Sequence, residues 1–159
     1  MKITVIAVGK VKEKYYRDAL TEYGKRLGRY CKLEMVEVED EKTPDGASSA
    51  EEDRIREKEA ERILKYVKED AFVLTLEIAG KMYDSVAFAR KLESLGIQGH
   101  SHLQFLIGGS LGLHERVCRR ADLSISFSQM TFPHQLMRVI LLEQIYRSYR
   151  IIHGEPYHK

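Results

Sequence analysis

The sequence has 159 residues, of which 43% are hydrophobic and 31% are charged, and its formal net charge is +2. These proportions exclude a disordered chain, and no apolar run approaches the roughly 20 residues that a membrane helix needs. Cys31 and Cys118 are far apart and lack metal-ligand spacing, so we expect free thiols in a reducing cytoplasm. This length suits one core, and we expect a single domain over residues 1–159.

The charge is unevenly distributed along the chain. Residues 1–30 carry eight basic and three acidic side chains, residues 34–70 carry seven and fourteen, and residues 114–159 carry seven and four. A basic face where the two chain ends meet would explain this pattern. Solvent-exposed helices of opposite net charge explain the pattern equally simply, and the charges alone favour this explanation over a basic face.

The first half of the chain predicts two strands and two helices. They are a strand at 2–8, an amphipathic helix at 12–27, a half-exposed strand at 33–38, a loop at 40–50 and a charged helix at 51–69. The first strand is a β-branched run that stops at Gly9, and the loop contains Pro44 and Gly46.

The second half continues the alternation. We expect a strand at 71–76, a helix from 85 to about 95, strands at 102–107 and 123–127, and a helix at 133–152. Ser85 is a candidate N-cap for the first of these helices. The last helix has Pro133 in its first turn and Gly154 just past its end, which is the usual asymmetry of helix ends.

Alternating strands and helices predict an α/β fold with a mainly parallel sheet covered by helices on both faces. Ligands bind such sheets beyond the carboxyl ends of the strands. Three strand ends therefore stand out as candidate site segments, at 76–80, 107–110 and 127–131.

The final helix is apolar nearly all round. Its apolar residues are Leu136, Met137, Val139, Ile140, Leu141, Leu142, Ile145, Tyr146, Tyr149, Ile151 and Ile152. A helix without a continuous polar face must be buried on most sides. One side would pack on the sheet and another on a second copy, so we expect a homodimer.

Two loops combine glycine or polar residues in patterns that suit a ligand. The 108–112 loop, GGSLG, is neither a P-loop nor a dinucleotide fingerprint, and it fits a tight turn as well as a ligand contact. The 128–134 segment, SQMTFPH, could grip the edge of a heterocycle with backbone groups. It could equally be a capping segment with Thr131 as N-cap.

The C-terminal tail, GEPYHK at 154–159, is polar, aromatic and basic. Chain ends are usually frayed, but this tail could bind RNA, because aromatic rings stack on bases and cations bind phosphates.

The sequence has no zinc spacing, no carboxylate-rich cation loop and no nucleophile elbow. We therefore expect chemistry without a metal and without a covalent enzyme intermediate.

Four motifs, FxIGG, SxMTxPHQ, EQxYR and the terminal PYHK, occur in order in FLIGGSLGLH and in LSISFSQMTFPHQLMRVILLEQIYRSYRIIHGEPYHK. With these motifs the chain closely resembles the ribosomal RNA large subunit methyltransferase H family of SPOUT-class enzymes. Its first 27 residues also resemble the opening of that family. The resemblance extends over the whole chain and is least distinctive in the acidic helix.

The resemblance implies a C-terminal trefoil knot, a homodimer and S-adenosyl-L-methionine as cofactor. The implied substrate is a pseudouridine of large-subunit ribosomal RNA, methylated at N3 in assembled ribosomes. The implied cofactor contacts are Leu76, Gly108, Phe127, Ser128, Gln129, Met130, Thr131 and Phe132. They fall on the three strand ends identified above.

A sulfonium methyl is already activated, so the enzyme must mainly align it with N3 and assist loss of the N3 proton. The candidate catalytic residues are His134, Arg138, Tyr157 and His158. Histidine titrates near neutrality, whereas arginine would hold charge rather than accept a proton. The base stays open, with water as an alternative, and we expect Tyr157, His158 and Lys159 to complete the site of the partner subunit.

Three other functions remain open from the sequence. The first is a knotted methyltransferase acting on another RNA such as tRNA. The second is a ribosome-binding factor without catalysis, which would bind ribosomes independently of the cofactor. The third is a nucleotide-binding regulatory protein, supported only by the glycine loop.

Overall fold

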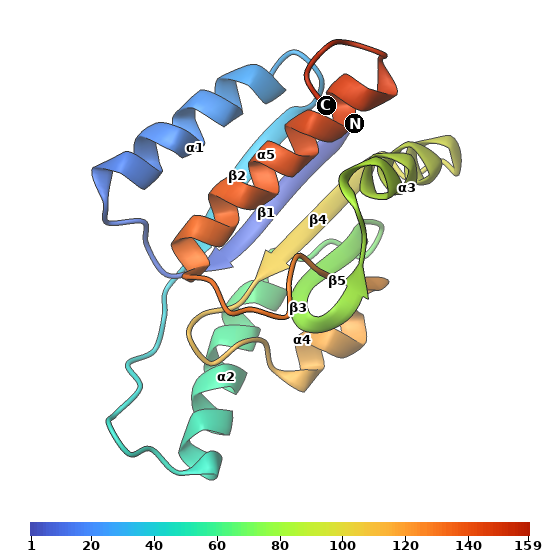
Figure 1. Cartoon of the computed structure of the whole chain (residues 1–159). Helices are drawn as coiled ribbons and strands as arrows, with labels where there is room; N and C mark the ends of the chain where they lie inside the picture. Colours follow the sequence, from blue (N-terminus) through green and yellow to red (C-terminus); the bar gives the residue numbers. More distant parts are fainter.

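Five strands and five helices alternate in the computed structural model, which describes all residues 1–159 (Figure 1). The strands are β1 (Lys2–Val8), β2 (Lys32–Val38), β3 (Phe72–Met82), β4 (His102–Ile107) and β5 (Leu123–Ser126). The helices are α1 (Lys14–Leu27), α2 (Ser49–Leu64), α3 (Ser85–Ile97), α4 (Glu115–Arg120) and α5 (His134–Ile152).

The strands form one sheet in the order β2-β1-β4-β3-β5, and every neighbouring pair is parallel. In the register of β1, Val5 lies between Met35 of β2 and Phe105 of β4. Because all strands point the same way, their carboxyl ends lie along one edge of the sheet. The predicted parallel α/β fold is confirmed.

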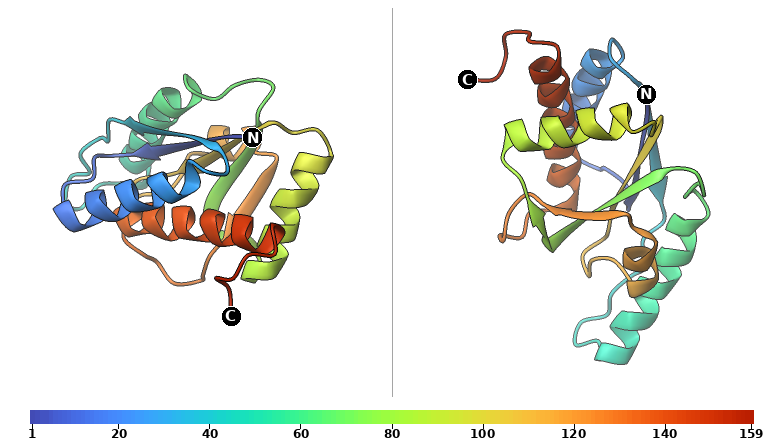
Figure 2. Two further views of the ribbon diagram at one scale, coloured as in Figure 1. Left: turned by 90° about the horizontal axis from the view of Figure 1, so that it is seen from above. Right: turned by 90° about the vertical axis from the view of Figure 1, so that its right-hand side faces the viewer.

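Helices cover both faces of the sheet. Helices α1, α3 and α5 lie side by side on one face, and α2 and α4 lie on the other (Figure 2). Side chains of β1 alternate between the two layers, with Val5 buried under the first group of helices and Ile6 under the second. The larger core lies on the α1–α3–α5 side, where Leu141, Leu142 and Ile145 of α5 are fully buried.

Two predicted helices differ from the structure at their ends. Helix α2 ends at Leu64 rather than 69, because the Gln104 side chain binds the backbone at Tyr66 and Lys68 and turns the chain toward β3. Asp84, not Ser85, caps α3 by accepting a hydrogen bond from the Ala87 amide. Helix α4 was not predicted, since six residues are too few to show a helical period.

Strand β3 is longer than the sequence indicates. It continues past Leu76 to Met82, and its pairing with β5 shifts register between Leu76 and Lys81. A Cβ at Gly80 would lie 2.6 Å from the Ile125 backbone carbonyl carbon, so glycine permits this close approach. The segment 76–80 is therefore a bulge within β3 rather than a strand end.

Helix α5 begins at His134, with Pro133 at the N-cap position and no side-chain capping bond, so Thr131 is not the cap. Its outward face starts apolar but becomes polar at Glu143 and Arg147, which corrects the expectation of a helix without a polar face. None of its residues is fully exposed.

None of the helices is long and apolar enough to cross a membrane. The trefoil knot stays a prediction.

Candidate functional site

A cavity of about 170 Å³ opens at the carboxyl edge of the sheet, between the ends of β4 and β5, the β3 bulge and the start of α5. Seven of the eight predicted cofactor residues line it. They are Leu76, Gly108, Phe127, Ser128, Met130, Thr131 and Phe132. Gln129 lies in the same loop but contributes nothing to the lining. The structure thus brings the three predicted segments together.

The glycine loop after β4 forms one wall of this cavity. The amide of Gly112 donates to the Gly109 carbonyl at 3.0 Å, and Gly112 has a φ of +81°, which glycine adopts without strain. A Cβ at Gly108 would lie 2.7 Å from the Gly112 carbonyl carbon. Only glycine fits at position 108, and the wall presents backbone rather than side chains to a ligand.

The loop after β5 forms the opposite wall and is held by two serines. Ser126 donates to the Ser128 carbonyl at 3.0 Å, and the Ser128 hydroxyl accepts from the Met130 amide at 2.9 Å. Phe127 packs edge-on against Phe88 of α3, with ring centroids 6.0 Å apart. The loop backbone is therefore fixed toward the cavity, whereas the Met130 side chain is 73% exposed.

Glu77 is a lining residue of the predicted 76–80 segment to which the sequence analysis assigned no separate role. Its carboxylate accepts hydrogen bonds from the hydroxyls of Thr75 and Ser124 and from the Cys118 thiol at 3.2 Å. Burial alone would raise the Glu77 pKa, but the three hydrogen bonds outweigh it and lower the pKa. Burial and the neighbouring carboxylate raise the pKa of Cys118 to about 11. An ionised carboxylate thus lies in the cavity wall, in contact with a neutral thiol that is not part of the lining.

The sequence indicates Glu77 through its place in the 76–80 segment, as a charged residue directly after the apolar run 71–76. Its hydrogen-bond donors come from three different elements, so sequence spacing could not assemble them. Within the whole structure no group of three or more His, Cys, Asp or Glu side chains is placed to hold a metal ion.

His134, in the first turn of α5, is the only one of the four predicted catalytic residues that lines the cavity of its own chain. Burial lowers its pKa, and the nearby positive charge of Arg138 lowers it further. The imidazole is therefore neutral near pH 7 and able to accept a proton. Its Nε2 atom lies 3.4 Å from the Cβ position at Gly9, so the loop after β1 adjoins the cavity.

Arg138 lies behind the cavity and not in its lining. The side chain is 1% exposed and donates to the carbonyls of Val8 at 3.0 Å and Gly9 at 2.8 Å. It also pairs with Glu37 at the end of β2. These contacts join α5 to the ends of β1 and β2 and hold the first turn of the helix beside the cavity.

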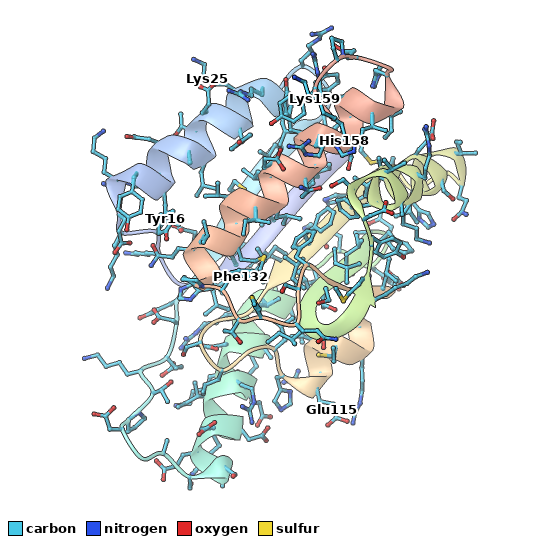
Figure 3. All side chains as sticks on the ribbon, in the orientation of Figure 1. Tyr16, Lys25, Glu115, Phe132, His158 and Lys159 are labelled. Carbon is cyan, nitrogen blue, oxygen red and sulfur yellow. The ribbon has the colours of Figure 1, made fainter.

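The C-terminal tail folds back over the second half of α5 (Figure 3). Tyr157 donates to Glu143 at 3.0 Å, its ring lies 4.7 Å from the Arg147 guanidinium carbon, and His158 contacts Arg147 at 3.1 Å. Burial and Glu143 raise the Tyr157 pKa to about 12. The nine residues from His134 to Glu143 span about 14 Å of helix, so the tail lies away from the cavity of its own chain.

The two basic chain ends lie side by side. The Arg26 guanidinium carbon of α1 is 5.6 Å from the ring centroid of Tyr146 in α5. Arg29 pairs with Glu155 of the tail at 3.4 Å. Helix α1 and the second half of α5 with its tail therefore share one surface, whereas the basic helix α4 lies with the acidic helix α2 on the other face of the sheet (Figure 2).

Comparison with known proteins matches the chain over its full length. A family model described as "Predicted SPOUT methyltransferase" covers residues 1–158. A Bifidobacterium adolescentis protein named "Ribosomal RNA large subunit methyltransferase H" is 64% identical over 159 residues, which is 100% of both chains. A Clostridium kluyveri protein of the same name is 56% identical, again over 100% of both chains.

A solved structure of a probable methylase family protein from Haemophilus influenzae Rd KW20 is similar in fold. The TM-score is 0.55 at 10% sequence identity, and the match covers 99% of this chain and 70% of that chain. At such low identity the likeness shows the fold alone. With the family model and the relatives matching from end to end, the chain belongs to the SPOUT methyltransferase family, among proteins named ribosomal RNA large subunit methyltransferase H.

Proposed function

We propose that the protein is an S-adenosyl-L-methionine-dependent methyltransferase that methylates N3 of a pseudouridine in large-subunit ribosomal RNA, acting on assembled ribosomes in the cytoplasm. The observation that carries the proposal is the cavity at the carboxyl edge of the sheet, lined by seven of the eight implied cofactor residues in a SPOUT-family chain. The names of its full-length relatives support the RNA substrate.

The residues of the cavity fit this cofactor. Fixed backbone groups of the 108–112 and 126–131 loops suit the edge of an adenine ring, and Leu76 and Phe127 suit its faces. The ionised carboxylate of Glu77 suits hydroxyl or cationic donors of the ligand. When bound, the cofactor would supply a methyl group already activated on a sulfonium.

His134 is the group that we assign to proton transfer. Its neutral imidazole would take the N3 proton of the pseudouridine, which leaves N3 as the nucleophile for the methyl group that the bound cofactor would supply. Arg138 holds the α5 turn that carries His134 and does not touch the substrate. Tyr157, with its raised pKa, donates a hydrogen bond rather than accepting a proton.

We also propose a homodimer in which the tail of one subunit completes the cavity of the other. The first half of the outward α5 face carries Leu136, Val139 and Ile140, all half-buried with nothing of this chain fully covering them. A two-fold axis perpendicular to α5 at this face would set the two α5 helices antiparallel. Tyr157 and His158, which lie over the second half of α5, would then approach the partner's first turn.

The deciding experiment measures methyl transfer from labelled cofactor to ribosomes, isolated subunits, naked ribosomal RNA and tRNA, and maps the product by mass spectrometry. We expect N3-methylpseudouridine in large-subunit RNA, formed fastest in assembled ribosomes. Labelling of tRNA would support a knotted methyltransferase with another substrate. Ribosome binding that is independent of the cofactor, without any transfer, would replace the enzyme with a binding factor.

A further inference from the structure

The loop that joins β1 to α1 carries basic residues beside the cavity. Strand β1 pairs with β4, so residues 9–13 after β1 are neighbours of the glycine loop after β4. Val8 approaches Gly109, with its Cγ1 atom 3.1 Å from the Cβ position there. On its other side the loop adjoins His134 through Gly9. The loop therefore lies beside two residues of the cavity lining, Gly109 and His134.

The charges of this loop are available to a ligand. Lys10 and Lys12 are exposed, and neither has a carboxylate within 4.0 Å. Arg17, one turn into α1, is also exposed and donates to the carbonyls of Val11 at 3.4 Å and Lys12 at 2.6 Å, without a carboxylate partner. Three cationic side chains without a carboxylate partner therefore lie in one short segment.

The loop is rigidly anchored, which distinguishes it from a strip of mobile surface lysines. The Val11 amide donates to Glu37 at 3.1 Å, and Glu37 in turn pairs with the buried Arg138. Arg138 also holds the carbonyl of Gly9. Because both ends of the loop are fixed to the core, a ligand loses little binding free energy in ordering it.

Two tyrosines, Tyr15 and Tyr16, follow this loop in the first turn of α1. Tyr15 is 66% exposed, and its ring packs edge-on against Tyr16 with centroids 4.5 Å apart. A tyrosine so exposed on the first turn of a helix leaves aromatic surface open to solvent. Unpaired RNA bases stack on such faces, and the stacking accepts any base.

We infer that Lys10, Lys12, Arg17 and Tyr15 form a docking strip for the RNA next to the target nucleotide, with the cations on phosphates and the tyrosine under an unpaired base. The inference rests on the proposed function, since it takes RNA as the substrate. The acidic helix α2 lies on the opposite face of the sheet, so charge repulsion would orient the bound RNA toward the strip.

The test compares the double variant Lys10→Glu/Lys12→Glu and the single variant Tyr15→Ala with the wild type. The control is Lys58→Glu/Lys65→Glu on α2, which makes the same charge change on the far face. Ribosome binding is measured by co-sedimentation between 50 and 200 mM salt, and methyl transfer is measured as kcat and KM. Calorimetry with S-adenosyl-L-methionine reports the integrity of the cavity.

We expect the double variant to bind ribosomes at least tenfold more weakly, with a salt slope lower by about one for each lost phosphate contact. Tyr15→Ala should raise KM about five- to tenfold, from the lost stacking. Cofactor affinity and the control should stay at wild-type values. Wild-type ribosome affinity and salt slope in the double variant would overturn the strip. An inactive wild-type protein that still binds ribosomes through the strip would instead overturn the proposed function.

Discussion

Tyr30 donates a hydrogen bond of 2.8 Å to Glu155, which joins the end of α1 to the C-terminal tail across 125 residues of sequence. Arg150 donates to the same carboxylate at 2.6 Å and to the Pro156 carbonyl at 2.8 Å. Tyr30 is itself stacked on Tyr149, with centroids 5.2 Å apart and ring planes 8° apart. The tail therefore rests on a rigid support and is not a frayed end.

Glu155→Ala removes the acceptor of these bonds. We expect kcat for ribosome methylation to fall about tenfold or more, because Tyr157 and His158 lose their fixed position. Amide exchange at 155–158 should accelerate, and Glu155→Gln, which keeps an acceptor oxygen, should recover part of kcat. Glu34→Ala, which breaks an ion pair with Lys2, is the control. Unchanged exchange and kcat in Glu155→Ala would show that the tail does not need this contact.

Deletion of 157–159 should leave cofactor affinity nearly unchanged and reduce methyl transfer by orders of magnitude. Mixing this truncated chain with a His134→Asn chain tests whether the tail acts across the dimer. Mixed dimers would contain one site with an intact cavity and an intact partner tail, and should restore about a quarter of the wild-type rate. No restoration, with mixed dimers verified by mass spectrometry, would place the tail in the site of its own chain.

Ile140→Glu places a charge in the centre of the outward apolar face of α5. We expect a folded monomer by sedimentation at micromolar concentration, because a buried unpaired carboxylate opposes the two-fold contact. Ile97→Glu is the matched control, since Ile97 is 81% exposed at the end of α3. A dimer of unchanged affinity in Ile140→Glu would move the interface to another face.

His134 should set the acid limb of the pH profile. Since burial and Arg138 lower its pKa, the imidazole stays neutral in the folded protein below pH 6.5, and kcat should fall only at more acid pH. His134→Asn should reduce kcat about 100-fold and abolish that limb, whereas His100→Asn at the opposite end of the sheet should change neither. A retained limb in His134→Asn would assign proton transfer to another group.

The same lowered pKa affects stability. Below about pH 6.5 the unfolded chain binds a proton at position 134 more readily than the folded chain does. The free energy of unfolding should therefore decrease as the pH falls through this range. The decrease should be smaller in His134→Asn, as measured by urea denaturation.

The cavity walls can be tested by Ser128→Ala. Losing the hydroxyl that accepts from the Met130 amide should loosen the loop and weaken cofactor binding about five- to tenfold, an effect of about 1 kcal/mol. Ser94→Ala removes a comparable hydrogen bond on α3 and should have no effect on binding. Gly108→Arg is a poorer probe, because any side chain there meets the Gly112 backbone and would disturb the loop itself.

Much of the fold could be predicted because its strands are apolar runs separated by amphipathic helices. Residues 77–82, EIAGKM, show neither the apolar run of a buried strand nor the spacing of an amphipathic helix. The β3 bulge that they form depends on a close approach of Gly80 to Ile125. The capping of α3 and the early end of α2 likewise depend on single side chains, Asp84 and Gln104.

The candidate site was predictable where it follows strand ends. The glycine loop and the loop after β5 meet because parallel strands end at one edge. The positions of Arg138 and Glu77 could not be anticipated, since their partners come from several distant segments. The sequence analysis made Arg138 a candidate for holding charge in the reaction, whereas its contacts describe a buried link between α5 and the sheet.

The link made by Arg138 also bears on how the chain folds. Its partners Val8 and Gly9 lie about 130 residues earlier, and the fully buried Leu141, Leu142 and Ile145 belong to the same late helix. Until α5 has been synthesised, α1 and α3 cover this face of the sheet without the helix that packs against both of them. Contacts of such long sequence separation form slowly and late. Before α5 docks, part of an apolar sheet face therefore stays uncovered, which exposes the folding chain to aggregation at that stage.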